Sequence, residues 1–348
     1  MRCTCTFLQL IYKKLYRNSG RERGTFMHYR EKLQRRNVTQ DVKHFEECEQ
    51  LFISVGRAYT VAALLQFFQI ETTEGSPKCN IPPHDVLHGD GDKELYFNTT
   101  LDKFVEEYLI PTPDANVPHP VADQQSTDLV KEYSLCLLRY FFILTDVKDA
   151  VREGDGDRLA TLHKLLLLHF KSDSGYNAYA IEMLIVILQN EVFLTEAESH
   201  QSKWAAIANW KGGNGNNIEM DLLQENINRD LKKGIKCMGA NKTDKSIERL
   251  SRAAGGLDEI IRNFDEQVGV KARSSSHSHK SSTYDEQQVL GDLIQLKPFL
   301  SIENRKHDCF PDASSDTLAT LKWDAFLKWL KHHKRNLLMD APVEDEEY

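Results

Sequence analysis

Apolar residues recur at helical spacing along most of this chain, and no long run alternates apolar with polar residues. Phe7, Leu8, Ile11, Tyr12 and Leu15 fall on one helical stripe. The segment 45–70 is long, apolar and almost free of helix breakers. Three further helical segments read STDLVKEYSLCLLRYFFILTDVKDAVRE, DRLATLHKLLLLHF and GYNAYAIEMLIVILQNEVFL. This spacing predicts a mainly α fold, an irregular multi-helix domain.

Polar, Gly-rich and Pro-rich stretches divide the chain into segments. We expect a short helix at 101–110, a helix at 242–267 with Thr243 or Asp244 as its N-cap, and a final helix at 316–338. The expected organisation is a basic N-terminal arm with the first helix (1–36), a helical domain (37–272) with loops at 71–92 and 111–125, a Ser- and His-rich linker (273–283), a C-terminal helical segment (284–335) and an acidic tail (336–348).

The composition is that of a chain with a sizeable hydrophobic core. The 348 residues are 41% hydrophobic and 28% charged, enough for one large domain or two ordinary ones. Seven cysteines are scattered without a CxxC pair, which favours a reducing compartment. No apolar run approaches the length of a membrane span, and the first residues do not read as a signal peptide. We therefore expect an intracellular protein, cytoplasmic or nuclear, without a membrane partner.

Charge is distributed unevenly along the chain. The net charge is −8, yet residues 2–36 hold ten Lys and Arg against two Glu. A basic segment on an acidic body attracts anionic partners, so DNA is a candidate partner. The candidate nucleic-acid-binding residues are Lys13, Lys14, Arg17, Arg21, Arg23, Arg35 and Arg36.

A loop of Gly and Asn runs directly into a patterned helix at 211–233, KGGNGNNIEMDLLQENINRDLKK. Asn216 or Asn217 is the expected N-cap. Asp221, Glu225 and Asn228 share one helical face. The pattern is typical of a metal-binding or acid/base face built on Asp221 and Glu225, or simply of a solvated helix with a capped start. The expected buried stripe is Leu223, Ile227, Leu231 and Ile235.

Three further motifs carry weaker signals. EGDGD at 153–157 is typical of a tight turn between helices. His84 and His88 lie with several Asp in a segment that predicts a loop, where nothing fixes a metal geometry. Trp323 and Trp329, with lysines between them, could stack on nucleic-acid bases or anchor the last helix to the core.

Several stretches together resemble one family. They are YKKLYRNSGRERGTFMHYREKLQRRNV, KDAVREGDGDRLATLHKLLLLHF, NAYAIEMLIVILQ, GGNGNNIEMDLLQENINRDLKKGI, ANKTDKSIERLSRAAGGL and NRKHDCFP. The set resembles the domain of unknown function 6589 family, transposon-derived-looking proteins of animals and fungi, over about residues 7–330. The resemblance implies a ribonuclease H-like transposase domain. In it Glu225 would be the third catalytic acid, Asn228 its neighbour and Asp221 a supporting carboxylate, acting with two Mg²⁺ ions in phosphoryl transfer on DNA.

The chain departs from that pattern at one place. Longer relatives carry two strand-borne acids upstream of the segment resembling LQLIYKKLYRNSGRERGT, whereas here only MRCTCTF precedes it. We therefore expect the helical C-terminal part of such a domain, a truncated and non-catalytic remnant that lacks the N-terminal strands and has no established cofactor. Two alternatives stay open. One is a Mg²⁺-dependent transposase or nuclease completed by the missing acids. The other is a DNA- or protein-binding module that uses the basic N-terminal segment.

Overall fold

The computed structural model describes residues 3–89, 91–110, 128–210, 212–240, 242–269 and 282–339. These residues form thirteen α-helices and one two-stranded antiparallel sheet, so the predicted mainly α fold is confirmed. The helices are α1 (Cys3–Leu15), α2 (Phe26–Lys32), α3 (Phe45–Phe67), α4 (His84–His88), α5 (Lys93–Phe104), α6 (Leu129–Glu153), α7 (Gly156–Lys171), α8 (Asn177–Leu188), α9 (Glu196–Ala205), α10 (Met220–Cys237), α11 (Asp244–Gln267), α12 (Ser282–Leu296) and α13 (Trp323–Met339). The strands are β1 (Ile207–Ala208) and β2 (Ile218–Glu219).

The chain divides into two compact units. The larger comprises Cys3–Lys148, Ala160–Thr195 and Ser281–Tyr348, and the smaller includes Asp149–Leu159 and Glu196–Lys280. Both units are therefore assembled from separated stretches of sequence. None of the helices in the described ranges is long and apolar enough to cross a membrane.

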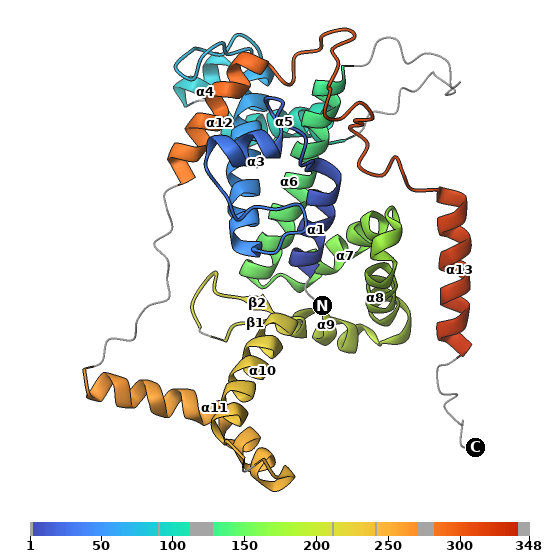
Figure 1. Ribbon diagram of the computed structural model, residues 1–348. Helices are drawn as coiled ribbons and strands as arrows, with labels where there is room; N and C mark the ends of the chain where they lie inside the picture. Colours follow the sequence, from blue (N-terminus) through green and yellow to red (C-terminus); the bar gives the residue numbers. More distant parts are fainter. Residues whose placement is uncertain are drawn as a thin grey trace. The chain divides into compact units, whose positions relative to one another are not determined.

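Helix α1 lies in the core of the larger unit (Figure 1). Its predicted stripe is confirmed, since Phe7, Leu8, Ile11 and Tyr12 are fully buried. Leu10, on another face of the helix, is also fully buried. A helix buried on several sides belongs in the middle of a core rather than on a surface. Residues 3–32 thus include α1 and α2 and contribute to the core of the larger unit.

Helices α3 and α6 approach each other closely. Gly56, in the middle of α3, faces the ring of Phe141 in α6, and a Cβ at Gly56 would lie 2.0 Å from Phe141 Cδ2. Phe141 also packs on Phe52, with ring centroids 6.2 Å apart. The missing side chain of Gly56 is what admits the aromatic ring.

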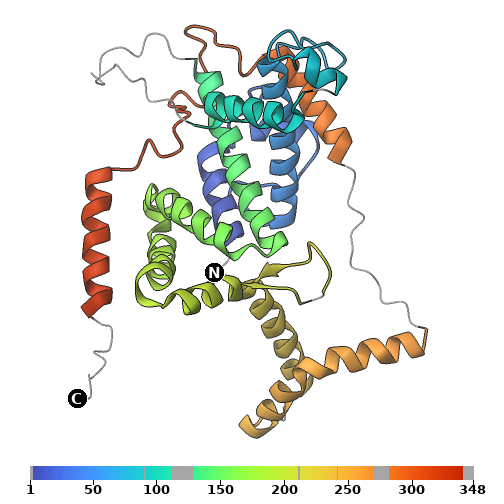
Figure 2. The ribbon, with the colours of Figure 1, turned by 180° about the vertical axis from the view of Figure 1, so that it is seen from behind.

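The residues after 281 complete the larger unit. Helix α12 runs alongside α3, as both views show (Figures 1 and 2). Val289 and Leu293 of α12 are fully buried. Further on, Arg139 of α6 donates hydrogen bonds to the carbonyls of Tyr108 and Ser315. The C-terminal segment is therefore an integral part of this core.

The smaller unit carries a β-hairpin followed by a helical pair. Strands β1 and β2 pair with Ile207 opposite Glu219 and Ala208 opposite Ile218. Helices α10 and α11 then pack on each other, with Gly234 against the Leu250 side chain. The Ser246 amide donates to Thr243 Oγ1 over 3.3 Å, so Thr243 serves the start of α11 as expected.

Several predicted boundaries are wrong. The expected loop 71–92 contains α4, whose C-cap Gly89 has a positive φ, and Asp92 caps α5 by accepting from the Leu95 amide over 3.0 Å. The sequence did not predict α2, α9 or the β-hairpin. The final helix begins at Trp323, because residues 317–320 form turns stabilised by Asp316 Oδ1, which accepts from the Leu318 amide.

Other expected segments fall partly outside the described residues. The loop 111–125 lies wholly outside them. Of the linker 273–283, Ser282 and Thr283 belong to α12. Of the tail 336–348, residues 336–339 belong to α13, and the remainder lies outside the described ranges.

Candidate functional site

The Gly- and Asn-rich loop is tied down before α10 begins. Asn217 Nδ2 donates to the carbonyl of Arg152 over 2.7 Å, and Asn216 Nδ2 donates to Gly212 O over 2.8 Å. Glu219, the last residue of β2, is the N-cap of α10 and makes no side-chain cap bond. The expected N-cap role of Asn216 or Asn217 is therefore wrong, because strand pairing places the N-cap at Glu219, two or three residues later.

The predicted acidic face of α10 is only partly enclosed. Asp221 and Glu225 are half-buried and Asn228 is exposed. Asn228 Oδ1 accepts a hydrogen bond from Gln224 Nε2 over 3.2 Å.

The predicted apolar stripe of α10 is also less buried than expected. Leu223, Leu231 and Ile235 are half-buried, while Ile227 is 42% exposed, so its predicted burial is wrong. Among the described residues α10 packs chiefly on α11, and a single helical neighbour covers only a narrow stripe.

Among the described residues, no third His, Cys, Asp or Glu ligand joins Asp221 and Glu225 of α10. Within the described ranges, only one group of three His, Cys, Asp or Glu side chains has converging ligand atoms, and that group lies elsewhere. Asp221 and Glu225 thus share one helical face, and no His, Cys or further carboxylate of the described residues completes a metal-binding group of three with them.

Most of the candidate nucleic-acid-binding residues contact acidic or polar groups of the protein. The pairs are Lys13–Asp173 (2.7 Å), Arg17–Asp312 (2.9 Å), Arg21–Glu31 (3.2 Å), Arg35–Asp285, Lys14–Thr320 (3.3 Å) and Arg23–Gln295 (2.8 Å). Arg36 is exposed, and its carbonyl accepts from Arg30 Nη2. Much of the excess positive charge of this segment is therefore compensated locally.

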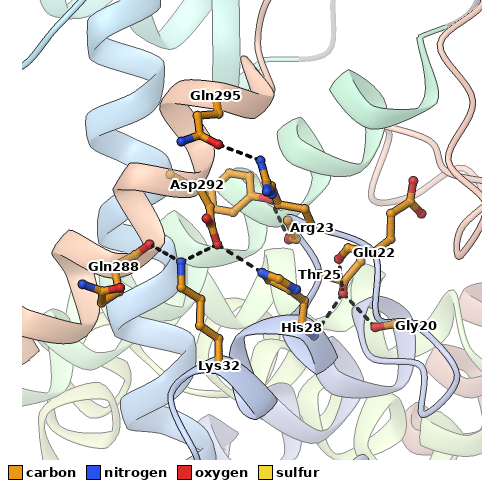
Figure 3. A network of polar contacts seen from close by, with 11 residues as sticks. Gly20, Glu22, Arg23, Thr25, His28, Lys32, Gln288, Asp292 and Gln295 are labelled. Atoms are coloured by element: carbon orange, nitrogen blue, oxygen red, sulfur yellow. Dashed lines mark hydrogen bonds and ion pairs between the residues drawn. The ribbon is translucent and has the colours of Figure 1, made fainter.

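Figure 3 shows how α2 holds α12. The Asp292 carboxylate lies 2.8 Å from Lys32 Nζ and 3.1 Å from His28 Nε2. Lys32 Nζ also donates to the carbonyl of Gln288 over 3.1 Å. Burial raises the pKa of Asp292, but the hydrogen bonds from Lys32 and His28 outweigh it and hold that pKa below its usual value. Lys32 and His28 of α2 therefore bind Asp292 of α12 and link the two helices.

The converging group of three consists of Glu22, His307 and Cys309. One ligand atom from each lies within 4.8 Å of the other two. Glu22 belongs to the loop between α1 and α2, and the other two lie in the segment that follows α12. The Cys309 amide donates to Glu22 Oε2 over 3.1 Å. Sequence reasoning missed this group: the spacing His-x-Cys was a weak signal, and nothing in the sequence joins it to Glu22.

His307 is the buried member of the group, and its side chain is 2% exposed. Its ring packs against Tyr133 and Phe310, with centroids 5.0 and 5.3 Å away. Nδ1 lies 2.5 Å from Glu22 Oε2, the distance of an ion pair. Burial lowers the pKa of His307, and the nearby Glu22 carboxylate does not restore it.

Helix α13 has two different faces. Phe326 is 7% exposed and stacks on Trp329, whose ring lies 4.6 Å from Lys171 Nζ. Trp323 is 53% exposed and Leu327 49% exposed. Trp329 therefore anchors the helix as one interpretation expected, whereas Trp323 does not.

The two remaining motifs are EGDGD at 153–157 and the pair His84 and His88. EGDGD forms the predicted turn between α6 and α7, with Gly154 at φ 77°. The Asp155 carboxylate caps α7 by accepting from the Arg158 amide over 3.0 Å. The rings of His84 and His88 lie 4.0 Å apart on α4, and no third ligand of the described residues joins them.

The chain matches the model of one protein family. A family model described as a family of unknown function (DUF6589) matches residues 1–277. The chain belongs to this family. Because the DUF6589 match ends at 277, short of the expected 330, the segment NRKHDCFP lies beyond it. No curated protein and no solved structure matches the chain.

Proposed function

We propose that this chain is a non-catalytic helical module of a transposase-like protein. The observation that carries the proposal is the arrangement on α10. Asp221 and Glu225 share a half-buried face, and no third His, Cys, Asp or Glu of the described residues converges on them. The transposase-like character is an inference from the motif resemblance in the sequence, since the matched family is described only as one of unknown function. The helical architecture is compatible with it.

The chemistry of two-metal catalysis explains why this arrangement favours a non-catalytic role. Two Mg²⁺ ions at about 3.5–4 Å clamp the attacking and leaving oxygens, and each ion needs near-octahedral oxygen coordination. One pair of carboxylates on a single helix supplies too few anionic ligands to place both ions. The catalytic alternative would need further acids from outside the described residues.

Binding of Mn²⁺, a spectroscopic substitute for Mg²⁺, tests the proposal. Electron paramagnetic resonance of free Mn²⁺ during a titration measures how much ion the chain takes up. We expect wild type and Glu225→Gln to take up the same amount. A saturable site that is lost in Glu225→Gln and kept in the α11 control Glu248→Gln would contradict the proposal and favour the catalytic alternative.

A second candidate function, contact with nucleic acid, is favoured by α13. Lys328, Lys331, Lys334 and Arg335 are all exposed and fall at helical spacing on one side of α13. Trp323 stands exposed at the start of the same helix. Cationic side chains that bind phosphates, beside an aromatic ring that stacks on a base, form a common single-strand-binding arrangement.

The salt dependence of DNA binding separates α13 from the N-terminal basic residues. Fluorescence anisotropy with a labelled single strand gives the slope of log affinity against log salt. Each lost phosphate contact reduces that slope by about 0.7 for single strands. We expect a reduction in Lys328→Gln/Lys331→Gln and none in Lys13→Gln/Arg17→Gln. The reverse result would assign binding to the N-terminal residues.

A further inference from the structure

We propose that Glu22, His307 and Cys309 form a binding site for one Zn²⁺ ion. The site joins the loop between α1 and α2 to the segment that follows α12. Glu22 lies inside the family match, and His307 and Cys309 lie beyond it. The inference is independent of the proposed function and of the α10 carboxylates.

The donor set selects the class of metal. A thiolate, an imidazole nitrogen and a carboxylate oxygen are the three kinds of ligand that proteins give to zinc. Hard cations such as Mg²⁺ and Ca²⁺ prefer oxygen ligands alone, so a thiolate and an imidazole argue against them. Three protein ligands leave a fourth tetrahedral position open to water or another small donor.

The distances suit zinc after a small adjustment. Zinc–ligand bonds of about 2.0–2.3 Å place tetrahedral ligand atoms about 3.3–3.7 Å apart. The three ligand atoms already lie within 4.8 Å of one another. Glu22 Oε2 and His307 Nδ1, now 2.5 Å apart, would have to separate by roughly 1 Å to admit the ion. Glu22 is partly exposed, so its side chain has room for this movement.

The surroundings position the ligands in advance. The ring of His307 is held by Tyr133 and Phe310 and presents Nδ1 to Glu22 Oε2 at 2.5 Å. The Phe310 amide donates to His307 O over 3.2 Å, which fixes the turn that brings Cys309 beside the imidazole. The alternative explanation is a simple ion pair between Glu22 and His307, in which the thiol takes no part.

Cobalt substitution distinguishes the two explanations. Co²⁺ is added to the metal-free full chain, and the near-ultraviolet absorption band of thiolate-to-cobalt charge transfer is recorded. We expect one Co²⁺ per chain, a thiolate band, and displacement of the cobalt by Zn²⁺. Cys309→Ser should abolish the band, and Glu22→Gln should weaken binding about tenfold or more. Cys79→Ser is the matched control, since Cys79 is a half-buried free thiol in the same unit.

Melting of each variant, followed by circular dichroism, shows whether it folds. If Cys309→Ser does not fold, the wild-type spectrum and Glu22→Gln decide the question. Absence of a thiolate band in the folded wild type would overturn the proposal and leave the ion pair. A band that persists in Cys309→Ser and disappears in Cys79→Ser would overturn it equally.

Discussion

Arg305 holds the carboxylate of Asp128 with two parallel hydrogen bonds, Nε to Oδ1 over 2.8 Å and Nη2 to Oδ2 over 2.7 Å. The Asp128 side chain is 4% exposed. It also accepts from the amides of Lys131, in the first turn of α6, and Ile302. One buried carboxylate therefore caps α6 and fastens a segment that lies beyond the family match.

Removing the cation of this pair should destabilise the larger unit strongly. Arg305→Ala leaves the Asp128 charge buried without its partner, and breaking a buried pair in this way costs about 3–5 kcal/mol. Urea unfolding of wild type and variant gives the difference. A loss below about 1 kcal/mol, the value of an ordinary surface pair, would show that the pair contributes little.

The same pair should make stability depend on acid pH. Burial raises the pKa of Asp128, but the hydrogen bonds from Arg305 and the two amides outweigh it and hold that pKa below its usual value. The stabilisation is therefore present above the unfolded-state pKa of about 3.9 and is lost as pH falls through the folded-state pKa. Asp128→Asn should be less stable than wild type at pH 7, with the gap closing in strong acid. A gap that stays constant down to pH about 2 would contradict this.

His169 should make the chain less stable in mild acid. It is fully buried between Phe7 and Tyr140, and neither ring nitrogen has a hydrogen-bond partner among the described residues. Burial, with a smaller effect of Lys14, lowers its pKa from 6.5 to about 4. Between those values the unfolded chain binds the proton and the folded chain does not, so stability falls by up to about 3 kcal/mol as pH decreases.

The matched variant for this prediction is His169→Phe. It keeps an aromatic ring in the same place and removes the titrating group. Thermal melts from pH 7 to 4 should show a smaller decrease in stability for the variant than for wild type. Equal decreases would assign the pH dependence to other groups.

The contact between Gly56 and Phe141 gives a prediction opposite to helix propensity. Alanine is favoured over glycine in a helix by about 1 kcal/mol. At Gly56, however, the new Cβ would lie 2.0 Å from Phe141 Cδ2. Such overpacking costs about 1–3 kcal/mol or more, so Gly56→Ala should lower the free energy of unfolding. Gly291→Ala in α12 is the control, because no atom lies within 4 Å of its added Cβ, and it should stabilise. A stabilising Gly56→Ala would show that α3 and α6 are less closely packed.

The sequence predicted local features well and long-range ones poorly. Hydrophobic period identified α1, α3, α6, α10 and α11 as separate helices, because each depends on neighbouring residues. The ion pairs of Asp292 with Lys32 and His28 join residues far apart in sequence, and no local sequence pattern predicts them. The same holds for the meeting of Glu22 with His307 and Cys309. Ile227 shows a different limit of sequence-based prediction. The pattern placed it on the apolar face of α10, but its burial depended on how many elements pack against that helix.

The most direct test of the non-catalytic account is a cleavage assay. The purified full chain is incubated with labelled duplex and single-stranded DNA in Mg²⁺ or Mn²⁺, beside Glu225→Gln. We expect no metal-dependent cutting or joining of DNA by either protein. Reproducible cleavage by the wild type that disappears in Glu225→Gln would contradict it.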